Sequence, residues 1–422
     1  MDICRNYKES GIFWQPSVPE EWVVTRLKHV LLKLSRERNP EDELLVCSNS
    51  GDVKKRGDSK LGLVAESNDI YQGVKAGDLL IHGMDTWHGA IAVSEYDGMC
   101  TPVVHVCDST QNKKYVALYL RNMASLKIFK LISNGVRQNT SDFRSWDKLA
   151  NIPIPLPPLA EQEKIVSYLE DKTSKIDAYV ADKEKEIELL QELKQKTIAD
   201  AVTKGLNPDV KMKDYSSLIS SLCPDHWKIV RNKSFLSLTG EKVGKKASEY
   251  VLLSLTTKGV IVRDIESGKG KFPKDFDTYQ IVKPNELVFC LFDIDETPRT
   301  VGLVETEGML TGAYTAFKVH TELANHEYIY NYYLCVDNIK ALKPYYSGLR
   351  KTVRADKFQQ IYMPLPPLDE QQAIVAYIEE KCEKIDKLAS ELQSEIDYLK
   401  EYKQRLIADC VTGQVNVQNE MI

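Results

Sequence analysis

One stretch of this sequence occurs twice, and the repeat limits the architectures that the chain can adopt. The first copy opens with Pro-Leu-Pro-Pro-Leu-Ala-Glu-Gln at residues 155–162 and closes with Ile-Ala-Asp-Ala-Val-Thr at 198–203. The second opens with Pro-Leu-Pro-Pro-Leu-Asp-Glu-Gln at 364–371 and closes with Ile-Ala-Asp-Cys-Val-Thr at 407–412. The offset is the same at both ends, since 364 − 155 and 407 − 198 both equal 209. About half of the paired positions are identical, which indicates an internal repeat.

Each copy has the hydrophobic spacing of a coiled-coil helix. The seam positions follow alternating steps of three and four residues, and Glu, Asp and Lys occupy the other faces. They are Val166, Leu169, Thr173, Ile176, Val180, Lys183, Ile187, Leu190, Lys194, Thr197 and Ala201 in the first copy, and Val375, Ile378, Cys382, Ile385, Ala389, Leu392, Ile396, Leu399, Lys403, Leu406 and Cys410 in the second. A helix of about 45 residues is about 65–70 Å long at 1.5 Å per residue, and so narrow a stripe needs a partner. We expect the two helices to pair antiparallel. The alternative is that each packs separately on a globular core.

The rest of the chain forms two globular segments with the same order of landmarks. Pro19-Glu-Glu-Trp22 begins the first and Pro224-Asp-His-Trp227 the second, and each continues with short strand-like runs and one helix candidate, at 113–123 and 326–340. The sequence therefore predicts an α+β protein in which two mixed α/β domains are joined by two long helices that form an antiparallel coiled coil. The predicted boundaries are 1–153 (globular), 154–207 (helical), 208–362 (globular) and 363–422 (helical).

The charge is distributed unevenly between these segments. The whole chain has a formal net charge of −5. Lys and Arg minus Asp and Glu give +1 for residues 1–153 and −3 for 154–207, then +3 for 208–362 and −6 for 363–422. Because the acidic excess lies on the helices, the globular segments can still present basic patches to phosphate.

Composition bounds the cellular setting. A run of 18 apolar residues is absent, and the first residues lack the apolar core of a signal peptide, so we expect a cytoplasmic protein without a membrane span. The nine cysteines contain no Cys-x-x-Cys pair, and we interpret them as reduced thiols.

No catalytic motif is evident in the sequence. The only Pro-Pro pairs are flanked by Leu, so the (Asp/Asn/Ser)-Pro-Pro-(Tyr/Phe) loop of amino-methyltransferases is missing, and there is no Gly-x-x-x-x-Gly-Lys-(Ser/Thr) phosphate loop. His82, His88, His105, Cys100 and Cys107 are close in sequence, but their spacing fits ordinary loop and strand positions better than a zinc site. We therefore expect neither a catalytic residue nor a metal site.

Three groups of residues are candidates for contacting nucleic acid. Basic clusters next to glycines can reach phosphates, and a Gly-x-Arg loop near the end of each globular segment offers Arg, Gln and Asn for reading bases. The loops at 85–89 and 293–299, which follow matching strands, form the third group, although Trp87 fits core packing at least as well. The candidates in the first two groups are Lys54, Lys55, Arg56, Lys60, Lys245 and Lys246, followed by Arg137, Gln138, Asn139, Arg144, Arg350, Lys351 and Arg354.

The paired openings and closings of the repeat, together with Tyr7-Lys-Glu-Ser-Gly11 and Pro19-Glu-Glu-Trp22, resemble the specificity subunit of type I restriction-modification systems. The likeness covers essentially the whole chain and implies two target-recognition domains and two helical regions. It further implies that the chain binds double-stranded DNA with a split target sequence and holds two methyltransferase (modification) subunits, joined in full complexes by restriction subunits. By the same resemblance, S-adenosylmethionine, ATP and Mg are used on those partner subunits, and this chain carries no cofactor.

Two other classes of function stay open at this point. One is an autonomous enzyme, such as a fused DNA methyltransferase or a nuclease, and the other is a coiled-coil adaptor with no role on DNA. The missing catalytic motifs weigh against the first alternative, and the basic globular segments weigh against the second.

Overall fold

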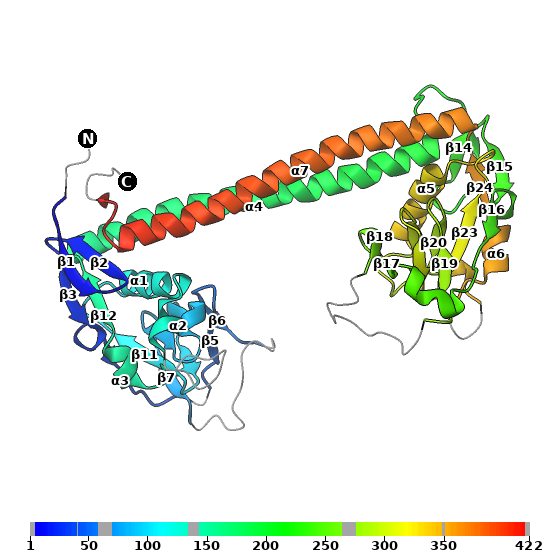
Figure 1. Ribbon diagram of the computed structural model, residues 1–422. Helices are drawn as coiled ribbons and strands as arrows, with labels where there is room; N and C mark the ends of the chain where they lie inside the picture. The colour runs from blue at the N-terminus through cyan, green and yellow to red at the C-terminus, as the bar shows by residue number, and fades with distance from the viewer. Residues whose placement is uncertain are drawn as a thin grey trace. The chain divides into compact units, whose positions relative to one another are not determined.

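The computed structural model describes residues 5–39, 41–57, 70–133, 143–263, 276–347 and 351–417. The chain divides into two compact units, one made of Met1–Glu184 with Ser394–Ile422 and the other of Lys185–Gln393 (Figure 1). Each unit contains one globular domain and a part of both long helices. Among the described helices, none has the length and apolarity that a membrane crossing requires.

The globular domain of unit 1 is built from short antiparallel strands. Its central sheet has four strands in the order β4-β11-β8-β9, and the pairs β1-β2, β3-β12, β5-β6 and β7-β10 surround it. The strands are β1 (Tyr7–Ile12), β2 (Gln15–Pro19), β3 (Val23–Arg26), β4 (Leu32–Lys33), β5 (Leu45–Cys47), β6 (Val53–Lys55), β7 (Gln72–Val74), β8 (Leu79–His82), β9 (Ile91–Val93), β10 (Gly98–Cys100), β11 (Val104–Asp108) and β12 (Pro153–Leu156). The helices are α1 (Lys113–Ser125), α2 (Ile128–Ile132) and α3 (Trp146–Ala150), with short 3-10 turns η1 (Leu27–His29) and η3 (Thr86–His88).

The globular domain of unit 2 has the same topology. Its four-stranded sheet runs β16-β23-β20-β21, and the pairs β13-β14, β15-β24, β17-β18 and β19-β22 match those of unit 1 one for one. The strands are β13 (Met212–Asp214), β14 (Leu222–Pro224), β15 (Lys228–Arg231), β16 (Leu236–Leu238), β17 (Leu253–Thr256), β18 (Gly259–Val262), β19 (Gln280–Val282), β20 (Leu287–Phe289), β21 (Val301–Leu303), β22 (Gly308–Leu310), β23 (Thr315–Val319) and β24 (Tyr362–Leu365). The helices are α5 (His326–Asn338) and α6 (Ala355–Gln360), with 3-10 turns η4 (Asn232–Ser234), η5 (Gly244–Glu249) and η6 (Lys343–Tyr345). Two segments with little sequence likeness thus share one fold.

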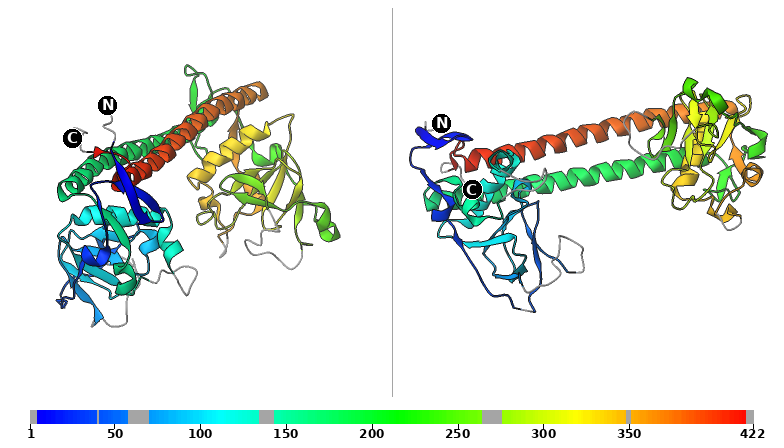
Figure 2. Two further views of the ribbon diagram at one scale, coloured as in Figure 1. Left: turned by 60° about the vertical axis from the view of Figure 1, so that its left-hand side comes forward. Right: turned by 60° about the horizontal axis from the view of Figure 1, so that its bottom comes forward.

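The two long helices are α4 (Leu159–Lys204) and α7 (Leu368–Val411), and they lie side by side in all three views (Figures 1 and 2). Cross-helix ion pairs give their direction. In unit 1, Asp177 of α4 pairs with Lys403 of α7 at 2.6 Å, and Glu184 pairs with Lys400 at 2.9 Å. Because the α7 partner has a lower number where the α4 residue has a higher one, the helices are antiparallel, as the sequence predicted.

The burial pattern confirms the seam. Every seam position named from the sequence is buried or half-buried, whereas most residues between them on α4 and α7 are exposed. Two seam positions carry lysines that are equivalent in the repeat. Lys403 pairs with Asp177 in unit 1, and Lys194 pairs with Asp386 at 2.6 Å in unit 2. A charged residue at a seam position fixes register at some cost in stability, so the repeated pair aligns the helices.

The proline-rich openings form strands as well as helix starts. Pro153–Leu156 is β12, paired antiparallel with β3, and Tyr362–Leu365 is β24, paired antiparallel with β15. Proline lacks the N–H that a central strand needs, so it is confined to edges and to two-stranded pairs such as these. Two residues separate the end of each strand from the start of its long helix. The repeat therefore ties a β-pair of each globular domain directly to the coiled coil.

Candidate nucleic-acid interface

In unit 1, the Glu-Gln of the repeated opening joins the globular domain to the coiled coil. Glu161 accepts a hydrogen bond from the buried Trp22 indole at 3.2 Å and two from the Arg5 guanidinium at 2.8 and 3.0 Å. The Gln162 carbonyl oxygen accepts from the backbone N–H of Asn112 at 3.0 Å, and its amide donates to the Pro157 carbonyl at 2.9 Å. Asn112 is the N-cap of α1, so Gln162 sets the position of that helix against α4.

Unit 2 forms the same joint with the second copy. Glu370 accepts from the Trp227 indole at 3.1 Å, and His226 Nε2 lies 2.7 Å from its other oxygen, in the place of Arg5. Gln371 accepts from the backbone N–H of Asn325 at 2.8 Å and donates to the Pro366 carbonyl at 2.8 Å. The repeated Glu-Gln therefore has the same structural role in both units.

A buried tyrosine ties each globular domain to the end of the other long helix. Tyr115 in α1 donates its hydroxyl hydrogen to the carbonyl of Val411 at 3.1 Å, and Tyr328 in α5 does the same to Val202 at 3.1 Å. Burial raises the pKa of both phenols well above their usual value, so both stay protonated donors. Each globular domain is thus held by the beginning of one helix and the end of the other.

A glycine follows the end of each long helix. Gly205 and Gly413 follow α4 and α7 with φ of +72° and +78°, which is the left-handed conformation that favours glycine. A Cβ on Gly413 would lie 2.6 Å from the Pro19 ring, and a Cβ on Gly205 would lie 2.8 Å from the Glu370 carboxylate. The glycines that end the helices also let the globular domains pack closely against them.

The structure places only part of the candidate DNA-contacting residues. Lys60, Arg137, Gln138, Asn139 and Arg350 lie outside the described residues. Lys54 and Lys55 lie on the β5-β6 hairpin, where both are exposed and paired with acidic neighbours, Asp52 at 3.0 Å and Glu43 at 3.3 Å. Arg56 follows directly and is half-buried. Lys245 and Lys246 lie exposed on η5.

Two of the candidate loops of unit 2 meet in space. Lys351 forms ion pairs with Asp295 at 3.3 Å and Glu296 at 3.1 Å, and its carbonyl accepts from the backbone N–H of Asp293. The Tyr346 hydroxyl, and then Lys351, lower the pKa of Asp295. Arg354 follows Lys351 closely in the sequence, is exposed, and pairs with Asp356 at 3.0 Å. The loop after β20 and the loop before α6 therefore form one surface.

Unit 1 brings together the equivalent loops. A Cβ on Gly83, next to the end of β8, would lie within 3.0 Å of the backbone of Phe143 and Arg144, and Arg144 is exposed. Trp87 is half-buried on η3, and the Lys130 ammonium of α2 lies 5.5 Å from its ring. Trp87 therefore packs against the core, which was the alternative to a role in a recognition loop. Arg299, at the end of the candidate loop 293–299, is held by the buried Asp337 at 3.2 Å. This geometry assigns Arg299 a structural role.

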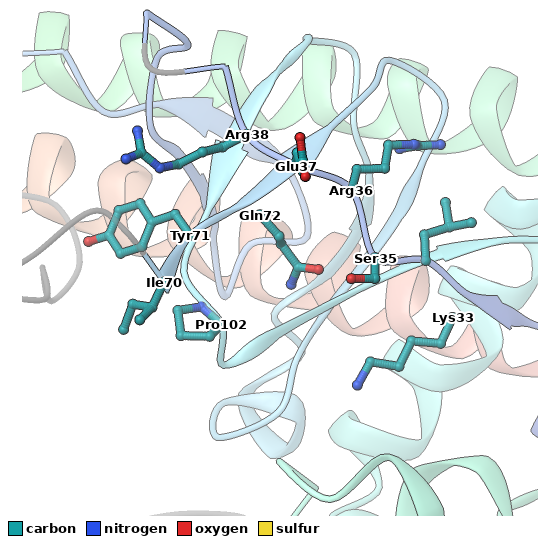
Figure 3. A pocket seen from close by; sticks show the side chains of 10 residues that line it. Lys33, Ser35, Arg36, Glu37, Arg38, Ile70, Tyr71, Gln72 and Pro102 are labelled. Atoms are coloured by element: carbon teal, nitrogen blue, oxygen red, sulfur yellow. The ribbon is translucent and has the colours of Figure 1, made fainter.

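Unit 1 contains a groove that was not predicted from the sequence (Figure 3). It has a volume of about 810 Å³ and lies between the segment after β4 and the residues around β7. Its lining is mostly polar or charged and consists of Lys33, Leu34, Ser35, Arg36, Glu37, Arg38, Ile70, Tyr71, Gln72 and Pro102. The basic residues are separated by neutral or acidic ones in the sequence, so no basic cluster signalled the groove.

His105 and the buried cysteines of unit 1 serve the core. The His105 ring contacts the Phe143 carbonyl at 2.7 Å, and burial raises the pKa of the Cys100 and Cys107 thiols to about 12. The eight cysteines of the described segments form no disulfide. Within the same segments, no three His, Cys, Asp or Glu side chains gather in a way that could hold a metal ion.

In the comparison with known proteins, one family sequence model matches the chain at two places. The sequence model of the type I restriction modification DNA specificity domain matches residues 88–189 and 305–398. Each match covers the second half of a globular domain and continues into the following long helix, so the two matches follow the internal repeat.

Curated relatives agree with this assignment. The protein named as the type I restriction enzyme MjaX specificity subunit of Methanocaldococcus jannaschii is 24% identical, with the alignment covering 98% of this chain and 97% of the relative. The MjaVIII specificity subunit of the same organism is 24% identical over 64% of this chain and 63% of its own length.

Solved structures share the fold. A structure described in work on the assembly and conformational transition of the type I R-M system has a TM-score of 0.65 at 15% identity, covering 94% of this chain and 99% of the other. The crystal structure of the HsdS subunit from Thermoanaerobacter tengcongensis has a TM-score of 0.52 at 16% identity, covering 94% and 98%. With the repeated joints and the antiparallel helices in place, the chain carries the type I restriction modification DNA specificity domain twice and resembles the specificity subunits of type I restriction-modification systems over its whole length.

Proposed function

We propose that this specificity subunit reads a bipartite, asymmetric DNA sequence, with one globular domain on each half. The observation that carries the proposal is that two domains of one topology are fixed to the coiled coil by the same contacts, while their exposed loops differ. Equal attachment gives both domains the same way of approaching a duplex, whose backbone has its own pseudo-dyad. Unlike loops give the two half-sites different sequences.

We further propose that two modification subunits dock on the coiled coil, one in each unit. In unit 1, Tyr179, Tyr398 and Tyr402 are exposed on the long helices, with Tyr398 and Tyr402 one turn apart on α7. The residues at the equivalent positions of the repeat are Leu388, Leu189 and Leu193, and they are exposed in unit 2. Exposed apolar clusters on coiled-coil helices are a feature of docking sites, and equivalent clusters suit two copies of one partner.

Two ion pairs between α4 and α7 in unit 1 fit solvent better than a partner. Lys400 pairs with the exposed Glu184, and the half-buried Lys403 pairs with the exposed Asp177, and pairs of this kind contribute little to partner affinity. Docking on the apolar clusters would leave these bridges undisturbed.

The chemistry of the complex belongs, in this proposal, to the partner subunits. The chain lacks the methyltransferase and phosphate-loop motifs, so S-adenosylmethionine, ATP and Mg would be held by the modification and restriction subunits. An assay of the isolated chain with S-adenosylmethionine and DNA separates this proposal from an autonomous methyltransferase, because transfer of a methyl group by the isolated chain would refute it.

Mapping of methylated adenines tests the reading of DNA. Cells that express the chain with its modification subunit should methylate a split motif with a fixed gap. Exchanging residues 5–156 for the equivalent domain of another specificity subunit should change one half of the motif and leave the other half as it was. A continuous motif, or a change in both halves, would refute the bipartite assignment.

Stoichiometry tests the docking surface. Tyr398→Ser with Tyr402→Ser should remove one modification subunit from the complex in native mass spectrometry, and Leu189→Ser with Leu193→Ser should remove the other. Lys400→Gln, at one of the ion pairs between α4 and α7, is the matched control and should leave two subunits bound. Loss of both partners from one double substitution would contradict two separate docking sites.

A further inference from the structure

The groove of unit 1 is the strongest site that the sequence candidates do not include. Figure 3 shows Lys33 at one end and Arg38 with Tyr71 at the other, and Ser35 and Gln72 lie between them. Lys33 is exposed, and Arg38 is half-buried. Sites for small ligands are mostly apolar, whereas this groove is lined mainly by charged and polar side chains. Its chemistry favours an extended anion.

Arg36 holds in place the segment that follows β4. Its guanidinium pairs with the buried carboxylate of Asp78, which precedes β8, and Asp78 also accepts from the backbone N–H of Lys75 at 2.8 Å. The hydrogen bond with Asp78 raises the pKa of Arg36. Because the charge of Arg36 is balanced by Asp78, we regard Arg36 as a positioning residue for its neighbours.

The segment has a counterpart in unit 2 that also carries basic residues. The backbone N–H of Leu34 donates to a backbone carbonyl of β11, and the backbone N–H in the middle of β7 donates to the Arg36 carbonyl. In unit 2 the backbone N–H of Thr239 donates to a backbone carbonyl of β23, and the backbone N–H in the middle of β19 donates to the Glu241 carbonyl. The segments after β4 and β16 are therefore equivalent, and the second continues with the exposed Lys242, Lys245 and Lys246.

We propose that the end of β4 with the segment after it in unit 1, and the segment after β16 in unit 2, contact the phosphate backbone of the DNA target, through Lys33 and Arg38 in unit 1 and through Lys245 and Lys246 in unit 2. This inference rests on the proposed function and adds the residues that position the duplex. Lysine and arginine bind phosphates without reading sequence, so these contacts supply affinity and register, and the neighbouring loops supply specificity. The Lys33 ammonium lies 5.9 Å from the Trp146 ring, so the groove leads toward the loop that carries Arg144.

Glu37 provides a second, independent test of the inference. Its exposed carboxylate lines the same groove, and a negative charge near phosphate opposes binding. Neutralising Glu37 should therefore act in the opposite direction to neutralising Lys33 or Arg38. A groove that bound a cation or a neutral ligand would not show this pair of opposite effects.

The experiment is a salt titration of DNA binding by the complex of the chain with its modification subunits. The slope of log affinity against log salt is negative. Lys33→Gln with Arg38→Gln should reduce its magnitude by about 2, because each lost phosphate contact contributes about 0.9. The ratio of wild-type to variant affinity should then shrink about tenfold between about 50 and 200 mM salt. The loss should be the same on target and non-target duplexes.

Three further variants complete the test. Lys245→Gln with Lys246→Gln should reduce the magnitude of the slope in the same way, and Glu37→Gln should raise the affinity. Lys127→Gln removes an exposed cation of unit 1 that does not line the groove, and it should leave the slope unchanged. Because the replaced side chains are exposed or line an open groove, thermal unfolding should not change.

The outcomes separate the two proposals. If the wild-type complex prefers its target duplex but both double variants keep the wild-type slope, the inference about the groove is wrong and the proposed function stands. If the wild-type complex shows no preference between target and non-target DNA, the proposed function fails, and the inference fails with it.

Discussion

Replacing Glu161 by glutamine tests whether the two joints, although built from the same motif, differ in energy. The Glu161 side chain is 3% exposed and its partner Arg5 is 7% exposed, so the substitution leaves a buried guanidinium without its main counter-charge. Breaking a buried pair in this way costs about 3–5 kcal/mol. The Glu21 carboxylate stays 3.6 Å from Arg5, which places the cost at about 3 kcal/mol, the low end of that range.

The equivalent substitution in unit 2 should cost much less. Glu370 is 24% exposed and His226 is 47% exposed, so water can replace the lost interaction. Exposed pairs of this kind contribute about 1 kcal/mol or less. A glutamine carbonyl can still accept from Trp22 or Trp227 in either joint, so the indole contact does not distinguish the two variants.

Native-state hydrogen exchange measures both costs in the full-length chain. The buried amides of α1 report the opening of unit 1, and those of α5 report the opening of unit 2. We expect Glu161→Gln to speed exchange in α1 about 150-fold, and Glu370→Gln to speed exchange in α5 about fivefold or less. Glu163→Gln, an exposed substitution on the first turns of α4, is the control. Equal effects of the two substitutions would refute the reasoning from burial.

Three other changes have defined outcomes. Tyr115→Phe and Tyr328→Phe each leave a buried carbonyl at the end of a long helix without its donor, and each should lower the free energy of unfolding by about 1–2 kcal/mol in urea titrations; no change would show that water replaces the hydroxyl. Lys194→Leu with Lys403→Leu should raise the thermal midpoint while allowing alternative alignments of α4 and α7, detected as additional products in cysteine cross-linking; a single product would contradict a register role for the seam lysines. We infer that the length of the coiled coil sets the gap between the half-sites, so removing one heptad near Lys183 together with its paired heptad in α7 should change the gap in the methylated motif, and an unchanged gap would contradict this inference.

The sequence was sufficient for the coiled coil because its signal is periodic and occurs twice. The steps of three and four identify the seam without any knowledge of tertiary contacts, and the structure buries or half-buries every position so identified. The predicted helices at 113–123 and 326–340 were also close to α1 and α5. Several strands near the start of each domain were not predicted, since strands of two to six residues carry too few positions for an alternating pattern.

The role of the repeated Glu-Gln could not be predicted, because it depends on distant partners. Trp22 lies 139 residues before Glu161, and Trp227 lies 143 residues before Glu370. Without an established tertiary structure, the motif could be interpreted only as the start of a helix. The groove was not predicted for a related reason, since Lys33 and Arg38 line one groove with Tyr71 only after β4 and β7 are placed.

The joints explain how the two globular domains can differ in sequence and still be attached in the same way. Each attachment uses side chains at equivalent landmarks, a tryptophan, a glutamate, a glutamine and a tyrosine, and two of these four belong to the repeat itself. None of the four lies in the candidate DNA-contacting loops or in the groove. Changes in those loops therefore leave the attachment to α4 and α7 intact. An attachment that shared residues with the recognition surface would couple every change of target to a change in domain position, and the separation seen here removes that coupling.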